Sequence, residues 1–208
     1  MSSHNEDGNS IVNDLNGMNF SNLYGAIDRQ NVHGLNLTTP EDAKAIIKPW
    51  AEREDDTIWA ESNVDDQLII HIPFMENVRL RSVLLKLGRG ESTPRHLRVF
   101  ANHSTIVDFA AAEATKPHLN ISLQEGETSV VEYPLRAAAF SSVHSLSLFF
   151  NEAVGEEVSR IYYIGFKGDM RSVKREVASE LEVPAPHTAD APLSQKAENR
   201  AAHRPTAH

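Results

Sequence analysis

The sequence predicts an all-β domain, an antiparallel sandwich or barrel, and three observations lead to this class. Short runs of strand-forming residues recur from residue 67 to residue 168. Turn residues separate these runs, and no helical pattern lies between them. Strands that follow one another without intervening helices pair antiparallel. The runs are VRLRS (78–82), VLLKL (83–87), HLRVF (96–100), TIVDF (105–109), LNISL (119–123), TSVVEY (128–133), SVHSLSLFF (142–150) and SRIYYIGFKG (159–168).

Two local patterns refine this prediction. VRLRS alternates apolar and polar residues, and VLLKL continues with the alternation shifted by one position, which predicts a β-bulge between the two runs. Ahead of the strands, residues 39–47 predict a short helix. Thr39 is a candidate cap, Pro40 suits a first helical turn, and Pro49 is expected to end the helix.

Composition divides the chain into three parts. Residues 1–20 are rich in Asn, Ser, Asp and Gly, and residues after 184 are mostly Ala, Pro and polar residues. Such segments bury too little apolar surface to offset the entropy lost on ordering. We therefore expect a disordered segment at 1–20, one β-sandwich domain at 21–175, and a mostly disordered segment at 176–208.

Charge and composition exclude several classes of function. The 208 residues carry a net charge of −9, which disfavours nucleic-acid binding because phosphate contacts need an excess of Lys and Arg. There is no cysteine, so disulfides, thiol catalysis and CxxC redox chemistry are excluded. The N-terminus lacks the apolar run of a signal peptide, and no segment predicts a membrane span. We expect an intracellular protein, monomeric and without membrane contact.

An acidic lip, Glu61, Asp65 and Asp66, precedes the apolar run LIIHIPF and raises the question of a metal or catalytic site. It lacks the glycine and the ligand spacing of a calcium loop. The ten histidines include no pair separated by one residue, as a strand-borne metal site would need. No nucleophile elbow and no phosphate-binding loop occurs. We therefore expect no catalytic residue, no metal, no cofactor and no enzymatic activity.

Aromatic residues leave a second function open. Trp50 and Trp59 flank the charged run AEREDD, and Tyr162, Tyr163 and Phe166 lie in the last predicted strand. Core packing is the expected role for most of them. An exposed aromatic ring at a loop end would suit sugar stacking, and Trp59 is the candidate. A small-ligand or carbohydrate-binding sandwich is therefore the alternative function, and an unrecognised hydrolase is a third.

Five stretches in order resemble the PITH domain, a proteasome-interacting domain found after thioredoxin domains or alone. They are LYGAIDRQNVHGLN (23–36), KPWAER (48–53), ESNVDDQLIIHIPF (61–74), NVRLRSVLL (77–85) and RIYYIGFKGD (160–169). The resemblance covers about residues 23–175 and implies a jelly-roll β-sandwich similar to galactose-binding-like domains. It also implies binding to the regulatory particle of the proteasome, with no catalytic residue, in the cytoplasm and nucleus. Without cysteine, the redox activity of thioredoxin-linked members does not carry over, so the chain resembles the stand-alone branch.

The resemblance also singles out individual residues. We expect the acidic lip to accept backbone N–H bonds at the turn that enters the strand. At the C-terminus, His208 is a candidate partner contact, because a terminal imidazole could ligate a metal of the partner. A tail without function is the other interpretation of this segment. The family-motif residues are Glu61, Asp65, Asp66, Pro73, Phe74, Tyr163, Gly165 and Gly168.

Overall fold

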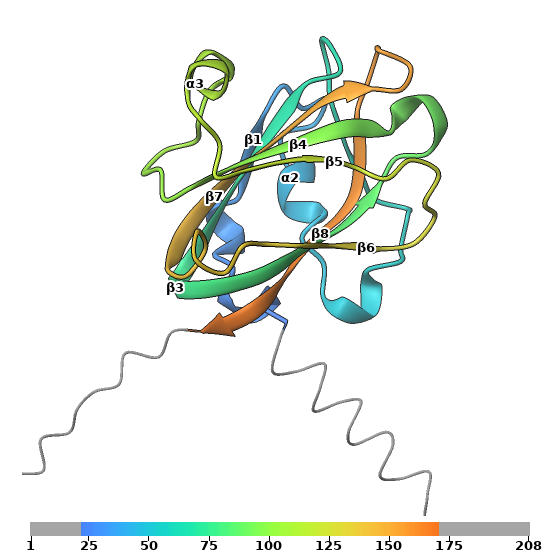
Figure 1. Cartoon of the computed structure of the whole chain (residues 1–208). Coiled ribbons are helices and arrows are strands. Elements are labelled where there is room, and N and C mark those ends of the chain that lie inside the picture. The colour runs from blue at the N-terminus through green and yellow to red at the C-terminus, as the bar shows by residue number, and fades with distance from the viewer. Residues whose placement is uncertain (1–21, 171–208) are drawn as a thin grey trace, which may run out of the picture. The chain divides into compact units, whose positions relative to one another are not determined.

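Antiparallel strands form two layers (Figure 1). Most of the apolar side chains are buried between them. The computed structural model describes residues 22–170; the predicted disordered segments, residues 171–175 and His208 lie outside this part. The strands are β1 (His33–Leu35), β2 (Ala60–Glu61), β3 (Leu68–Leu87), β4 (Pro94–Ala101), β5 (Leu119–Ser122), β6 (Val131–Pro134), β7 (Val143–Ala153) and β8 (Arg160–Met170). The helices are α2 (Asp42–Ala45) and α3 (Phe109–Ala114), with 3-10 turns η1 (Tyr24–Ala26), η2 (Arg29–Asn31), η3 (Trp50–Glu52) and η4 (Gly90–Ser92).

The strand β3 belongs to both layers. Its first part pairs with β1 and β7, and its second part pairs with β8 and β6. The order is therefore β1-β3-β7-β4-β5 in one layer and β6-β3-β8-β2 in the other. The register of β3 against β7 shifts between Pro73 and Val78, and three of the four intervening residues are exposed. A bulged stretch lets one strand bend from one sheet into the other.

The run LIIHI is apolar on nearly every position because this part of β3 is covered on both faces. Leu68, Ile70 and Ile72 point into the main core between the layers. Ile69 points the other way, into a second cluster with Phe149. A sheet buried on both faces loses the alternation that a half-exposed strand shows. The other members of the second cluster are Phe100, Val107 and Ala112.

The predicted bulge is confirmed. Leu80 pairs with Gly168 but Ser82 pairs with Lys167, so one residue is extra between them on β3. The two predicted strands at 78–82 and 83–87 are parts of one strand that begins at Leu68. The predicted strands at 96–100, 119–123, 128–133, 142–150 and 159–168 are present as β4 to β8, with shifted ends.

The predicted strand at 105–109 is wrong. The Asp108 carboxylate accepts a hydrogen bond from Ala111 N at 2.7 Å and caps helix α3, which replaces the predicted strand. A capping carboxylate satisfies a free N–H of the first helical turn and so favours helix there. Val107 is still buried, but it packs on the outer face of the β3–β7 layer instead of pairing.

The predicted helix at 39–47 is shorter than expected. Helix α2 covers only Asp42–Ala45, and no side-chain cap forms at its start. Thr39 contributes its backbone carbonyl, which accepts from Asp42 N at 3.1 Å. The helix ends before Pro49, because Ile46 and Ile47 turn into the main core.

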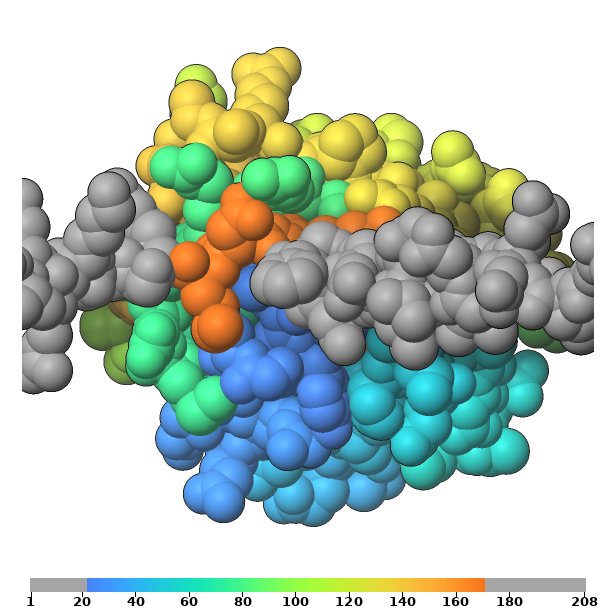
Figure 2. Space-filling view, turned by 90° about the horizontal axis from the view of Figure 1, so that it is seen from below, coloured from blue at the N-terminus to red at the C-terminus, as the bar shows by residue number. Residues whose placement is uncertain are grey.

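Residues far apart in the sequence meet where the described part of the chain begins and ends. Asn22 bridges to Lys167, and Met170 pairs with Val78. Figure 2 shows this end, with residues of β8 in orange beside β3 in green and the first described residues in blue. Within residues 22–170, no helix has the length and apolar character to cross a membrane.

Candidate functional site

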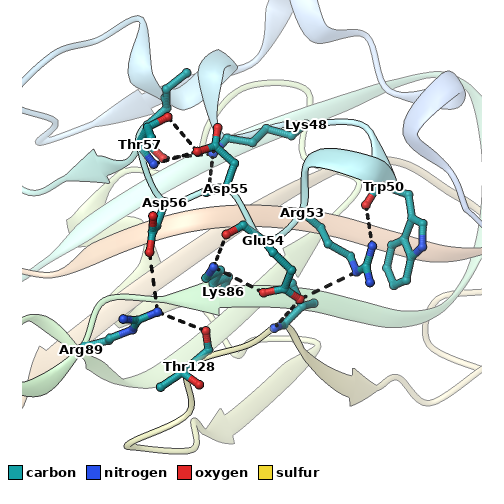
Figure 3. A network of polar contacts seen from close by, with 12 residues as sticks. Lys48, Trp50, Arg53, Glu54, Asp55, Asp56, Thr57, Lys86, Arg89 and Thr128 are labelled. Atoms are coloured by element: carbon teal, nitrogen blue, oxygen red, sulfur yellow. Dashed lines mark hydrogen bonds and ion pairs between the residues drawn. The ribbon is translucent and has the colours of Figure 1, made fainter.

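Residues 48–61, here the rim segment, run from the end of the α2 region to β2 and are held in place by a buried lysine. The side chain of Lys48 is buried, and its Nζ donates to the carbonyls of Asp55 (2.8 Å) and Ile58 (3.1 Å) (Figure 3). The Asp55 carboxylate lies 3.6 Å from the same nitrogen. A buried ammonium group is costly unless it is paired and hydrogen-bonded, so Lys48 fixes the path of the chain around it.

A second buried lysine holds the rim segment from the side of β3. Lys86 Nζ donates to the carbonyl of Glu54 and lies 3.3 Å from its carboxylate. The Glu54 carboxylate also accepts from Val130 N at 3.4 Å. Next to it, Arg89 Nη2 lies 3.6 Å from Asp56 Oδ2, as Figure 3 shows. The acidic residues of AEREDD are thus mostly structural, because cations of the sandwich neutralise them.

Local bonds within the rim segment set its final turn. Asp55 Oδ1 accepts from the backbone N–H of Thr57 at 2.9 Å and from its hydroxyl at 2.7 Å. These two bonds hold the pKa of Asp55 below its usual range, because both favour the ionised carboxylate. The turn is a side-chain-stabilised one of the kind that Asp favours. It points the following residues, Ile58 and Trp59, outward.

At the start of the rim segment, Trp50 packs under a cation. The Arg53 guanidinium lies 4.1 Å from the centre of the Trp50 ring and donates to the Trp50 carbonyl at 3.0 Å. Trp50 Nε1 is buried and has no hydrogen-bond partner within residues 22–170. The packing role expected for this tryptophan fits these contacts.

Ile58 and Trp59 form an exposed apolar pair. Their exposed fractions are 43% and 40%. The Trp59 ring is held in place, because the Arg160 guanidinium lies 5.0 Å from its centre and Tyr162 packs against it edge-on at 6.3 Å. Arg160 is itself fixed by Glu61, with Nε to Oε2 at 2.6 Å. An aromatic ring that is exposed yet immobilised suits contact with another molecule.

A hollow of about 390 Å³ lies beside this pair and is the candidate functional site. It forms between two segments that are distant in the sequence, the α2 entry and the end of the rim segment. Its lining combines hydroxyls, two carboxylates and the apolar pair, and it contains no cationic side chain. The lining residues are Thr38, Thr39, Asp42, Thr57, Ile58, Trp59 and Glu61.

The reactive groups of this hollow are few. Within residues 22–170, no group of three or more His, Asp or Glu side chains could hold a metal ion. Glu61 is engaged by Arg160, and no histidine or nucleophile other than threonine lines the hollow.

The three carboxylates of the acidic lip have different partners: a nearby backbone N–H, a backbone N–H of β7, and the Arg160 guanidinium. Asp65 Oδ1 accepts from Gln67 N (3.0 Å), and Asp66 Oδ2 accepts from Ala153 N (2.7 Å). Glu61 differs from the expectation, because it bonds the Arg160 guanidinium and no backbone N–H. Of the lip, only Glu61 lines the hollow.

Asn36 is the partner of the lip that sequence reasoning missed. Its amide donates to Asp65 Oδ1 (2.7 Å) and to the Gln67 carbonyl (2.6 Å), while its oxygen accepts from Val64 N (3.0 Å). Asn36 has a positive φ of 57°, which Asn tolerates better than most residues. The sequence signal for this role is an Asn directly after a short strand, a position where Asn often forms a turn.

The other family-motif residues lie in the sheets, away from the hollow. Phe74 packs edge-on against Phe166 with ring centres 5.5 Å apart, and the Pro73 carbonyl accepts from Asp28 N at 2.9 Å. The bond to Asp28 and a bridge between Ile27 and Phe74 tie the first described residues to β3. Pro73 and Phe74 therefore serve packing and chain path.

Close packing in β8 accounts for Tyr163, Gly165 and Gly168. Burial raises the pKa of the Tyr163 phenol to about 12. Its ring folds over Gly165, where a Cβ would overlap the phenol oxygen. At Gly168 a Cβ would overlap the carbonyl of Arg79 on β3. Both glycines permit close approach at positions that a side chain would block.

Comparison with known proteins supports the family. The PITH domain model matches residues 13–185. The PITH domain-containing protein CG6153 of Drosophila melanogaster is 36% identical over 71% of this chain and 69% of that protein. PITH domain-containing protein 1 of Danio rerio is 32% identical over 74% and 72%, and the Homo sapiens protein of that name is 29% identical over the same shares.

Solved structures show the same fold at low sequence identity. The CBM32-1 and CBM32-2 domains of Clostridium perfringens ZmpB superpose with a TM-score of 0.51 at 12% identity. The match covers 81% of this chain and 41% of that one. It establishes a galactose-binding-like β-sandwich and, at this identity, nothing about ligands. With this fold and the match over residues 13–185, the chain belongs to the PITH domain family.

Proposed function

We propose that this chain is a non-catalytic, monomeric protein-binding module whose partner is the regulatory particle of the proteasome, in the cytoplasm and nucleus. The observation that carries the protein-binding part is the exposed Ile58–Trp59 pair, held by a rim segment that two buried lysines fix. The choice of partner rests on the resemblance to the PITH family.

Physical chemistry favours a protein as ligand of this face. Trp is enriched among the residues that carry most of the binding energy at protein interfaces. The Trp59 ring loses little freedom on binding, because Arg160 and Tyr162 already hold it. The hollow beside it offers a place for a partner side chain.

The test is binding of the full chain to purified proteasome regulatory particle, measured by biolayer interferometry with the purified proteolytic core particle as control. We expect saturable binding to the regulatory particle alone. A second chain lacking residues 184–208 separates the sandwich from the C-terminal segment: retained binding assigns the contact to the sandwich. Equal signals from regulatory particle and core particle would contradict the proposed partner.

Carbohydrate binding is the second candidate, because the hollow has the parts that a sugar site uses. Trp59 supplies an aromatic ring, and the hydroxyls of Thr38, Thr39 and Thr57 supply hydrogen-bond groups. A ligand that binds only the native state raises the melting temperature. Screening galactose and related sugars by thermal shift tests this candidate. A rise that the Trp59→Ala variant abolishes would favour it over a protein ligand.

A further inference from the structure

We propose that the hollow beside Trp59 receives a partner segment that presents an apolar side chain next to a lysine or arginine. This proposal rests on the protein-binding function above and specifies the chemistry of the bound segment. Two properties of the hollow carry it, the charge of its lining and the position of its exposed apolar pair.

The charge of the lining is negative and is not neutralised from within. Asp42 and Glu61 are its ionisable side chains. Glu61 is paired with Arg160, whereas no ion pair within residues 22–170 involves Asp42. Lys44, the nearest lysine in the sequence, pairs instead with Glu41 at 3.4 Å. Asp42 is therefore a carboxylate free to pair with an incoming cation, and an acidic segment would be repelled.

The apolar part of the lining determines the rest of the ligand. Ile58 and Trp59 are among the few large apolar side chains that the described chain leaves exposed. They border the same hollow as Asp42. An apolar side chain placed there removes both from water, which is the main favourable contribution at an interface. A cation alone would pair with Asp42 but leave Ile58 and Trp59 exposed, and an apolar group alone would leave Asp42 unpaired.

The hollow is also formed before any ligand arrives. Lys48 bonds the Ile58 carbonyl, and Asp55 bonds Thr57, so the backbone beneath the apolar pair is held at several points. A preorganised site avoids the entropy of ordering a loop on binding. A short segment can therefore bind here with measurable affinity.

The first experiment identifies the ligand chemistry without assuming a partner. Random twelve-residue peptides displayed on phage are selected on the immobilised full chain. We expect the enriched peptides to share an apolar residue next to Lys or Arg. Enrichment of acidic peptides, or of no peptide family at all, would overturn the proposal.

The second experiment locates the site with matched variants. A selected peptide carrying a fluorophore is titrated by anisotropy against the full chain. We expect Ile58→Ser to weaken binding at least tenfold and Asp42→Asn about threefold to tenfold, with a weaker salt dependence for Asp42→Asn. Val64→Ser changes a side chain that is more exposed but outside the hollow. Glu76→Gln removes an exposed carboxylate outside the hollow. Both controls should bind as the unaltered chain does. Equal losses in variants and controls would refute the site.

The same variants distinguish failure of this proposal from failure of the proposed partner. If the regulatory particle does not bind but basic–apolar peptides bind at Ile58, the partner is wrong and the ligand chemistry stands. If the regulatory particle binds and Ile58→Ser has no effect, the hollow is not the contact. If removal of residues 171–208 tightens peptide binding at least tenfold, the chain's own segment occupies the hollow in the full chain, which overturns a partner segment as its occupant there.

Discussion

The main core and the rim segment are held together by different forces. Between the sheets, strands β3, β7 and β8 bury aromatic and aliphatic side chains such as Phe166 with almost no exposure. The rim segment instead depends on Lys48 and Lys86, whose ammonium groups bond backbone carbonyls. Apolar burial is non-directional and scales with area, whereas hydrogen bonds from a buried cation fix positions.

This difference separates stability from recognition. The core supplies most of the free energy of folding, because large apolar areas leave water there. The rim segment contributes less area but keeps Ile58 and Trp59 in one exposed arrangement. Substitutions in the two regions should therefore differ in what they change, as the following predictions specify.

The largest expected effect is loss of stability on truncating the core. Phe166→Ala removes a fully buried ring that packs against Phe74 and should lower the free energy of unfolding by about 4 kcal/mol. Phe109→Ala is the matched control, since that ring is only half-buried and packs on Phe149 in the second cluster. It should cost about half as much. Urea unfolding followed by circular dichroism measures both, and equal losses would contradict a dominant main core.

A buried histidine in β3 should make core stability depend on pH. His71 bonds Ser147 Oγ at 3.0 Å, and burial, followed by the charges of His33, His103 and His144, lowers its pKa to about 4. The unfolded chain then binds more protons between pH 6.5 and pH 4, so stability is complete above pH 6.5 and falls as the pH drops towards 4. The loss over this range should reach about 3 kcal/mol.

The measurement is the urea midpoint at several pH values between 4.5 and 7.5. His71→Gln should flatten the dependence in this range, whatever its effect at pH 7.5. The exposed His118 gives the control, and His118→Gln should keep the dependence of the unaltered chain. A slope unchanged by His71→Gln would assign the acid sensitivity to other groups.

The sequence predicted the sandwich well where one local signal dominates. The phase shift between VRLRS and VLLKL predicted the bulge that the pairing of Leu80 and Ser82 shows. TIVDF misled, because Asp108 caps a helix and Val107 is buried without pairing, and β propensity cannot detect that competition.

The candidate site was less predictable. Trp59 was recognised as an exposed candidate, but the hollow joins Asp42 to Ile58 across the fold. Lys48 acts as a buried anchor only because the folded rim segment places the carbonyls of Asp55 and Ile58 around its Nζ. Neither spacing nor composition contains that information, because a lysine is expected at the surface.

An intermediate effect is expected when the anchor of the rim segment is removed. Lys48→Met keeps the length of the side chain but leaves the carbonyls of Asp55 and Ile58 without their donor. We expect the free energy of unfolding to fall by about 2 kcal/mol. Amide hydrogen exchange in residues 53–59 should become faster than this global loss explains, whereas exchange in β7 should rise only as much as the global loss predicts. Lys44→Met, at an exposed pair with Glu41, should cost under about 0.5 kcal/mol. Unchanged exchange in the rim segment would show that Lys48 does not anchor it.

The smallest effect on stability should come from Trp59, and this tests the separation most directly. Trp59→Ala removes an exposed ring with its contacts to Arg160 and Tyr162, and such contacts at the surface contribute about 0.5–1 kcal/mol. Binding of the selected basic–apolar peptide should nevertheless fall at least tenfold, because the ring borders the hollow. Thermal unfolding and peptide anisotropy on the same preparation measure the two quantities. A stability loss of about 3 kcal/mol or more, comparable with Phe166→Ala, would show that Trp59 belongs to the core, and its exposure would then no longer indicate a binding face.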